Sequence, residues 1–211
     1  MDSEREGAVA DRRYSLTIYF GRRGLMGKDE DGIREQILKV DRRMPREQLE
    51  RHLIEFIKSH KVCVLSTSKD DVPRATPVTY YAQGTTLYIL GDAGTTKLKN
   101  LRANPRVSVG IYGPLTSWRS VKGIQITGHA TLITEDHSEF EEALRIYNFK
   151  ERMKESIKGM REALGKDTEK EIQVTRPPKG VVVIKIESKK IELCEYALLP
   201  QGLDFRQVWE P

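Results

Sequence analysis

Residues 44–133 alternate between short apolar runs and polar turns, which is typical of a β-rich domain. A helix is predicted to begin near Pro45, because Leu49, Leu53 and the apolar residues after them fall on one face. The links between the later runs are too short for crossover helices, so neighbouring strands are expected to be antiparallel. The predicted strands are VCVLST (62–67), RATPVTYYA (74–82), TLYIL (86–90), RVSVGIY (106–112) and VKGIQITGHATLI (121–133), with a short helix at TTKLKNLRAN (95–104).

The second half of the chain contains a long amphipathic segment before the last strands. Residues 135–164 carry Phe140 and Leu144 on one stripe, which predicts a long helix or a broken pair of helices. A polar loop is expected at 165–179, and residues 180–196 predict a strand pair or one bent strand. Six or more short strands with a helix between them favour a closed or split barrel, so the fold class is mainly β (α+β) with flanking helices.

The same patterns divide the chain into three parts. Residues 1–43 are charged and form an N-terminal arm, in which the alternation at 14–20 is compatible with a short strand. The barrel domain is expected at 44–199 and includes a helical insertion at 135–179. Residues 200–211 are the C-terminal tail.

Charge and cysteine usage narrow the function classes. The 211 residues have a formal net charge of +5, but Lys and Arg alternate with Asp and Glu over most of the length. A mixed solvated surface is therefore favoured over a nucleic-acid surface. Cys63 and Cys194 are far apart and have no Cys or His at metal-ligand spacing, and no apolar run reaches 18 residues. We expect a reduced cytoplasmic protein with no metal site and no membrane segment.

The segment GDAGTTKLKN (91–100) is the best candidate for an anion site. It combines a glycine turn, the hydroxyls of Thr95 and Thr96 and the charge of Lys97 at the start of a short helix. Unpaired amides and the dipole at a helix N-terminus attract phosphate. The alternative is a capped surface helix with a solvated lysine.

A second candidate is RATPV (74–78). Arg74 opens a strand, so its guanidinium is able to reach the same phosphate, whereas Pro77 indicates an edge or an irregular stretch because proline has no N–H to donate. Amides freed there would suit the edge of a planar ring. The alternative is a plain edge strand with an exposed Arg74. Only one hairpin separates 74–78 from 91–97, so the two segments are able to lie side by side.

From Glu47 to about Leu132 the chain resembles the FMN-binding split-barrel superfamily related to pyridoxamine 5'-phosphate oxidase. The resemblance rests on the helix before the barrel, on CVLST followed by a turn and RATPV, on LYILGDAGTTKLKNLRANPRVSVGIY and on KGIQITGHATLI. The T-x-K-x-x-N-L-R-x-N-P-R-V pattern is its most specific part. The chain departs from the vitamin oxidase itself, since we find no counterpart of the C-terminal Trp-and-Arg segment or of the Arg-and-His substrate clamp.

The resemblance implies a six-stranded antiparallel split β-barrel and a homodimer with two molecules of flavin mononucleotide (FMN) at its interface. It implies that Arg74, Thr96 and Lys97, helped by Thr95, hold the phosphate. Trp118 or Trp209 is a candidate for covering the ring from the partner subunit. The other residues implied near the cofactor are Ala75, Thr76, Pro77 and Val78 along the ring and ribityl chain, Leu90 and Gly91 on the next strand, and Gln125.

No set of catalytic side chains is evident, which suits a protein whose cofactor supplies the chemistry. The first hypothesis is an FMN-dependent oxidoreductase that acts on a small-molecule substrate or electron donor. The second is a non-catalytic flavin-binding redox or stress protein, with the helix at 135–164 closing the substrate face. The third is a barrel that binds a deazaflavin or haem.

Overall fold

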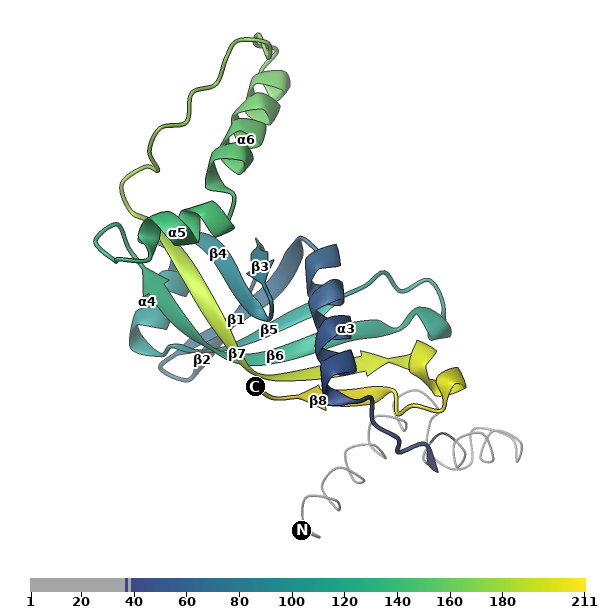
Figure 1. Ribbon diagram of the computed structural model, residues 1–211. Coiled ribbons are helices and arrows are strands. Elements are labelled where there is room, and N and C mark those ends of the chain that lie inside the picture. The colour runs from purple at the N-terminus through teal and green to yellow at the C-terminus, as the bar shows by residue number, and fades with distance from the viewer. Residues whose placement is uncertain (1–36, 38) are drawn as a thin grey trace.

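The computed structural model describes residues 37 and 39–211, and these form one curled antiparallel sheet with flanking helices (Figure 1). The sheet has eight strands in the order β2-β1-β5-β6-β7-β4-β3, with β8 paired to β7. The strands are β1 (Val62–Lys69), β2 (Val72–Thr79), β3 (Tyr81–Gln83), β4 (Thr86–Asp92), β5 (Arg106–Tyr112), β6 (Lys122–Ile133), β7 (Val181–Glu195) and β8 (Arg206–Trp209).

The helices pack on both faces of this sheet. Helix α3 begins after Pro45 and buries Leu49, Leu53, Phe56 and Ile57 against the core. The apolar side chains on the concave side of the strands complete that core. The helices are α3 (Arg46–Ser59), α4 (Thr96–Ala103), α5 (Phe140–Ile146) and α6 (Phe149–Ala163), with short 3₁₀ turns η1 (Trp118–Ser120) and η2 (Tyr196–Gln201).

The split-barrel fold class is confirmed, and the strand count differs from the six expected. The six longer strands match the expected set, while β3 and β8 are extra short strands. β3 is separate because Tyr80 breaks the expected strand 74–82. Its N–H donates to the carbonyl of Lys61 (3.1 Å) and its buried hydroxyl donates to the carbonyl of Ile57 (2.6 Å). β8 lies in the expected tail.

Strand β7 is one bent strand. Its register against β6 shifts between Thr127 and Gly128, where Lys189 is the extra residue of a bulge. A Cβ on Gly128 would lie 2.8 Å from the carbonyl oxygen of Glu187. Only glycine permits this close approach, so the bend that curls the sheet depends on it.

The helical insertion is a broken pair of helices. The break falls at Asn148, which adopts a left-handed conformation (φ 57°) between α5 and α6. Helix α5 packs on the convex side of β4 and β7 through a second apolar cluster that includes Phe140, Leu144 and Tyr147. Helix α6 and the loop after it project away from the sheet (Figure 1).

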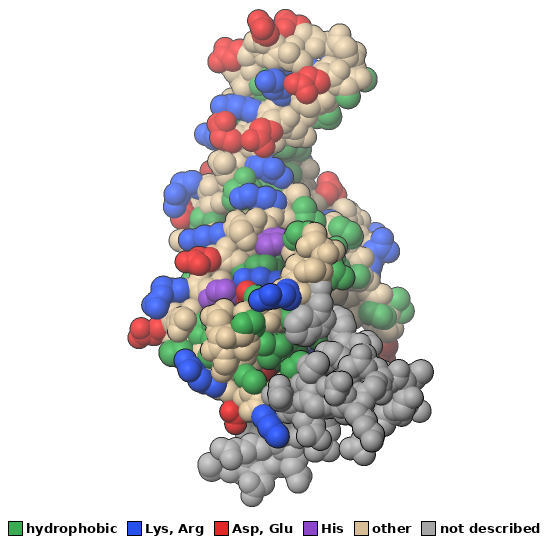
Figure 2. Space-filling view, turned by 90° about the vertical axis from the view of Figure 1, so that its right-hand side faces the viewer, with side chains coloured by type: hydrophobic (Ala, Val, Ile, Leu, Met, Phe, Trp, Pro, Cys, Tyr) green, Lys and Arg blue, Asp and Glu red, His purple; other side chains and the backbone are tan. Residues whose placement is uncertain are grey.

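The segments before α3 are described only in part. Most of the expected arm 1–43, including the candidate strand at 14–20, lies outside the described residues. Within the described residues no helix is both long and apolar enough to cross a membrane. Acidic and basic side chains are interspersed on the face shown in Figure 2.

Candidate functional site

A gap between β2 and β4 is the central feature of the candidate site. Cα atoms of the two strands come within 8 Å, but the two strands do not pair in the described sheet. β3 pairs with β4 in the register Tyr81↔Tyr88, which would set Val78 opposite Gly91 if it continued. β2 instead pairs with β1 over its whole length. The facing edges of β2 and of the end of β4 are therefore open.

The turn that leads from β4 into α4 is held by Asp92. Its carboxylate accepts a hydrogen bond from the N–H of Gly94 (2.8 Å), and its carbonyl accepts from the N–H and the hydroxyl of Thr95 (3.0 and 2.7 Å). Arg102 also donates to the carbonyl of Ala93 (3.0 Å). The hydroxyl of Thr95 is thus engaged by the turn, and its expected help with a phosphate stays a prediction.

Arg74 projects on the side of the sheet where α4 lies. It pairs in register with Thr67 on β1, and directly paired residues project to the same face. The Thr67 hydroxyl accepts a 3.1 Å hydrogen bond from the side-chain amide of Asn100, which belongs to α4. Arg74 is therefore on the same side of the sheet as α4, on a strand that is not paired with β4. Its expected closeness to residues 95–97 stays a prediction.

Gly91 brings the stem of Lys97 against the end of β4. A Cβ on Gly91 would lie 2.8 Å from a methyl carbon of Leu98 and 3.6 Å from Cε of Lys97. The side chains of Arg74, Thr96 and Lys97 make no hydrogen bond or ion pair with the part of the chain that the structure describes. Two cations and a hydroxyl are therefore available to a ligand at this end of the gap.

The strand residues expected along the cofactor divide between two faces. Thr76 and Val78 share the face of Arg74, because they pair with the buried Leu65 and Cys63. Ala75 and Pro77 project to the opposite, convex face and reach the gap only through their backbone. Leu90 also lies on the convex side, where it packs against the cluster under α5.

Gln125 lies apart from the phosphate-binding candidates within one chain. Cross-strand pairs place it in one row with Pro77, with Val64 and Gly110 between them. Three strand spacings correspond to roughly 14 Å. Gln125 lines an open cavity of about 830 Å³ on the convex face of β5–β8, and that cavity includes neither Arg74 nor Lys97.

Comparison with known proteins identifies the fold family. The family model for pyridoxamine 5'-phosphate oxidase matches residues 49–193. The chain belongs to this family. No curated protein gave a significant match.

Solved structures of similar fold include members related to the pyridoxamine 5'-phosphate oxidase family. A candidate oxidase of Listeria innocua is 26% identical, with a TM-score of 0.49, over 69% of this chain and 97% of that one. A conserved hypothetical protein of Mycobacterium tuberculosis has 18% identity and a TM-score of 0.52 over 72% and 87%. An FMN-binding protein of Nostoc punctiforme, related to pyridoxamine 5'-phosphate oxidase, has 15% sequence identity and a TM-score of 0.47, over 72% of this chain and 84% of that one.

Trp209 does not project from this member of the pyridoxamine 5'-phosphate oxidase family. Its ring is buried in the core of its own chain, and Nε1 lies 3.4 Å from a carboxylate oxygen of Glu50. The burial follows from β8 pairing with β7 beneath α3. Trp209 is therefore unable to cover a ring held by another subunit without leaving this core.

Sequence reasoning missed an ionic cluster that this family member builds between α3, β6 and β7. One carboxylate oxygen of Glu195 lies 2.5 Å from Nε2 of His52 and 3.0 Å from Nζ of Lys122. Burial by itself would raise the pKa of Glu195, but the hydrogen bonds and charges of His52 and Lys122 hold that pKa below its usual value. Each of the three residues is at least 70 positions from the other two in the sequence, so no local pattern indicates that they meet.

Sequence reasoning also missed a second cavity beside Leu90. It measures about 420 Å³ and is bordered on one side by α6, through side chains that include Phe149 and Arg152. The amphipathic stripe of residues 135–164 is the signal that could have found it, because the stripe continues past the part that packs on the sheet.

Proposed function

We propose that the protein binds FMN in the gap between β2 and β4 and acts as an FMN-dependent oxidoreductase on a small molecule. The observation that carries the proposal is the pair of cations at one end of an open strand gap, Arg74 on β2 and Lys97 on α4. Neither side chain has a partner in the part of the chain that the structure describes. An anionic group on a flat ring would use both the cations and the open edges.

The phosphate would lie at the start of α4. The first N–H groups of a helix have no acceptor within the helix, and its dipole favours an anion there. Arg74, Thr96 and Lys97 would add three donors, two of them charged. The glycine turn held by Asp92 fixes the start of α4 before the ligand arrives, which lowers the entropy cost of binding.

The ring would lie along the open edges. In β4 the residues after Tyr88 have no partner strand on the β3 side within the described sheet, so their backbone groups are available to the polar edge of an isoalloxazine. When bound, the flavin supplies the hydride and electron chemistry. The chain's own groups would bind it, orient it and leave one face open to a substrate.

We also propose that two copies complete the site. On the convex face, Gln125 lies in one cross-strand row with Gly110, Val64 and Pro77. These three residues are small or apolar, and no helix of the described chain covers them. A second copy packed on this face would bring its Gln125 to the first copy's gap. The free thiols of Cys63 and Cys194 support a reducing, cytoplasmic location.

The test is a titration of the purified protein with FMN, followed by visible absorption and by quenching of flavin fluorescence. Each charged phosphate contact contributes about 1.5–3 kcal/mol, so the double variant Arg74→Ala/Lys97→Ala should weaken binding by roughly 10²- to 10⁴-fold. Lys99→Ala is the matched control, because Lys99 is exposed on the same helix and should leave the affinity unchanged.

Unchanged affinity in the double variant, or no uptake of FMN by the unaltered chain, would refute the flavin site. A Soret band in the purified protein would favour haem, and uptake of a deazaflavin alone would favour that cofactor. Bleaching of bound FMN by NADH or NADPH, with reoxidation by an acceptor, would support an enzyme. A flavin that stays oxidised with both donors would favour the non-catalytic alternative. Sedimentation of the same sample tests the dimer.

A further inference from the structure

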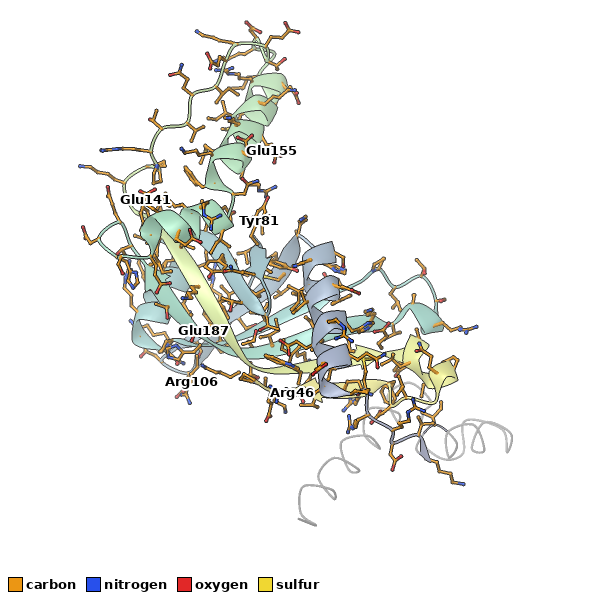
Figure 3. The ribbon with its side chains drawn as sticks, in the orientation of Figure 1. Arg46, Tyr81, Arg106, Glu141, Glu155 and Glu187 are labelled. Atoms are coloured by element: carbon orange, nitrogen blue, oxygen red, sulfur yellow. The ribbon has the colours of Figure 1, made fainter. Side chains whose placement is uncertain are left out.

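The second cavity lies between the end of β4 and the insertion helix α6. Leu90, which lines it, is also one of the residues expected beside the cofactor, so the cavity adjoins the proposed flavin gap. Figure 3 labels Glu155 on α6, which lines the cavity, and Tyr81 on the nearby strand β3. The cavity is lined by Leu90, Tyr147, Phe149, Arg152, Met153, Glu155 and Ser156.

Four of its seven lining residues are apolar or aromatic. Tyr147 packs edge-on against Tyr81, with ring centroids 5.3 Å apart, and its hydroxyl lies 3.2 Å from that of Thr79. Both contacts fix the orientation of the Tyr147 ring. With Phe149 and Met153 beside it, the cavity offers faces against which a flat aromatic ring packs well.

Its charges cancel. Arg152 is the positive residue of the lining and Glu155 the negative one. Nη1 of Arg152 lies 3.6 Å from a carboxylate oxygen of Glu155, one turn along α6. The Arg152 guanidinium also lies over the Tyr81 ring, 5.9 Å from its centroid. A ligand that enters here meets a guanidinium donor and a carboxylate at nearly the same place.

We propose that this cavity binds an uncharged, planar aromatic carbonyl compound, and that Glu155 sets this preference. The proposal rests on the proposed function, since it makes the cavity the substrate side of the flavin gap. A neutral carbonyl oxygen is able to accept a hydrogen bond from Arg152 while the ion pair persists. An anionic group would face the carboxylate of Glu155 as well, and like charges a few ångströms apart repel.

The experiment compares two ligands of similar shape and different charge, acetophenone and benzoate, by calorimetric titration of the full chain. The unaltered protein should bind acetophenone more tightly than benzoate. Glu155→Gln removes the repulsion. Because the Glu155 side chain is 70% exposed, water screens its charge, so the affinity for benzoate should rise by roughly two- to five-fold, while the affinity for acetophenone changes by less than about two-fold. Glu151→Gln is the matched control, because Glu151 lies one turn earlier on α6, pairs with Lys154 and does not line the cavity.

The proposal is overturned if acetophenone does not bind, if benzoate binds the unaltered protein as tightly, or if Glu155→Gln leaves the ratio of the two affinities unchanged. Both ligands are titrated with and without FMN, which separates the two proposals. Failure of FMN to bind while the charge preference persists refutes the flavin site and supports the cavity. FMN binding without any preference between the two ligands supports the flavin site and refutes the proposal for the cavity.

Discussion

Substitution of Glu195 by Gln tests how much the ionic cluster contributes to the stability of the fold. The Glu195 side chain is 10% exposed, and its oxygen serves both His52 and Lys122, which are 27% and 26% exposed. Removing one partner of a fully buried pair costs about 3–5 kcal/mol, and an exposed pair contributes about 0.2–1 kcal/mol. Because the side chains of His52 and Lys122 retain some contact with water, we expect Glu195→Gln to lower the free energy of unfolding by about 2–3 kcal/mol.

The pH dependence of this effect has a definite sign. The folded-state pKa of Glu195 lies below its usual value, and an unfolded glutamate titrates near about 4.3. The stabilisation is therefore fully present above that unfolded pKa and is lost as the pH falls through the folded pKa. The difference between the unaltered protein and Glu195→Gln should shrink in acid.

Urea unfolding followed by the fluorescence of the buried Trp209 measures both quantities, at equal protein concentrations and at several pH values from 6.5 to 3 (roughly the range that spans the carboxylate titration). Glu192→Gln on the same strand is the control. Glu192 pairs with Lys190 at 3.0 Å, and both side chains are well exposed (44% and 39%), so its loss should cost less than about 1 kcal/mol. Equal losses in the two variants, or a Glu195→Gln loss that is the same at every pH, would refute the reasoning.

Two further predictions concern glycines and thiols. Gly128→Ala should destabilise the fold by about 1–3 kcal/mol in the same urea titration, because its Cβ would meet the carbonyl of Glu187. Gly159→Ala on α6 should instead stabilise the fold by up to about 1 kcal/mol, because a Cβ there meets nothing within 4 Å. Burial raises the pKa of the Cys63 thiol to about 12, so a thiol reagent at mildly alkaline pH should modify only Cys194, and slowly, before unfolding. Two thiols that react in the native protein would contradict this.

Elements whose limits depend on local chemistry were predictable. The helix expected at 95–104 is α4, because Asn104 before a proline ends it as the sequence indicates. The break at Tyr80 was not predictable, since it depends on a hydrogen bond to the carbonyl of Ile57 on another element. The pairing of β8 with β7 was also not predictable. The η2 turn separates the two strands, so no local sequence pattern indicates that they pair.

For the candidate site, the sequence argument depends on a single hairpin. Arg74 and Lys97 are linked by a single hairpin, so chain connectivity alone brings their segments together. Gln125 was harder to place, because its distance from the gap depends on the register of three successive strand pairs. The contribution of α6 was harder still, since the insertion packs on the sheet through α5 and the left-handed residue Asn148 sets the direction of α6.

The gap exists because the strand pairing changes at Tyr80. After Tyr80, β3 pairs with β4, whereas before it β2 pairs with β1. The register of β3 against β4 would otherwise carry on and pair Val78 with Gly91, which would close the barrel. The buried Tyr80 donates to the carbonyl of Ile57 on α3 and to that of Lys61, just before β1, which favours the turn toward β1. Pro77 brings no N–H to a continued ladder. Arg74 and Lys97, which would hold the phosphate, are therefore not among the residues that open the barrel. It follows that loss of Arg74 or Lys97 should leave the fold intact, and that weakened FMN binding in those variants would report on the site itself.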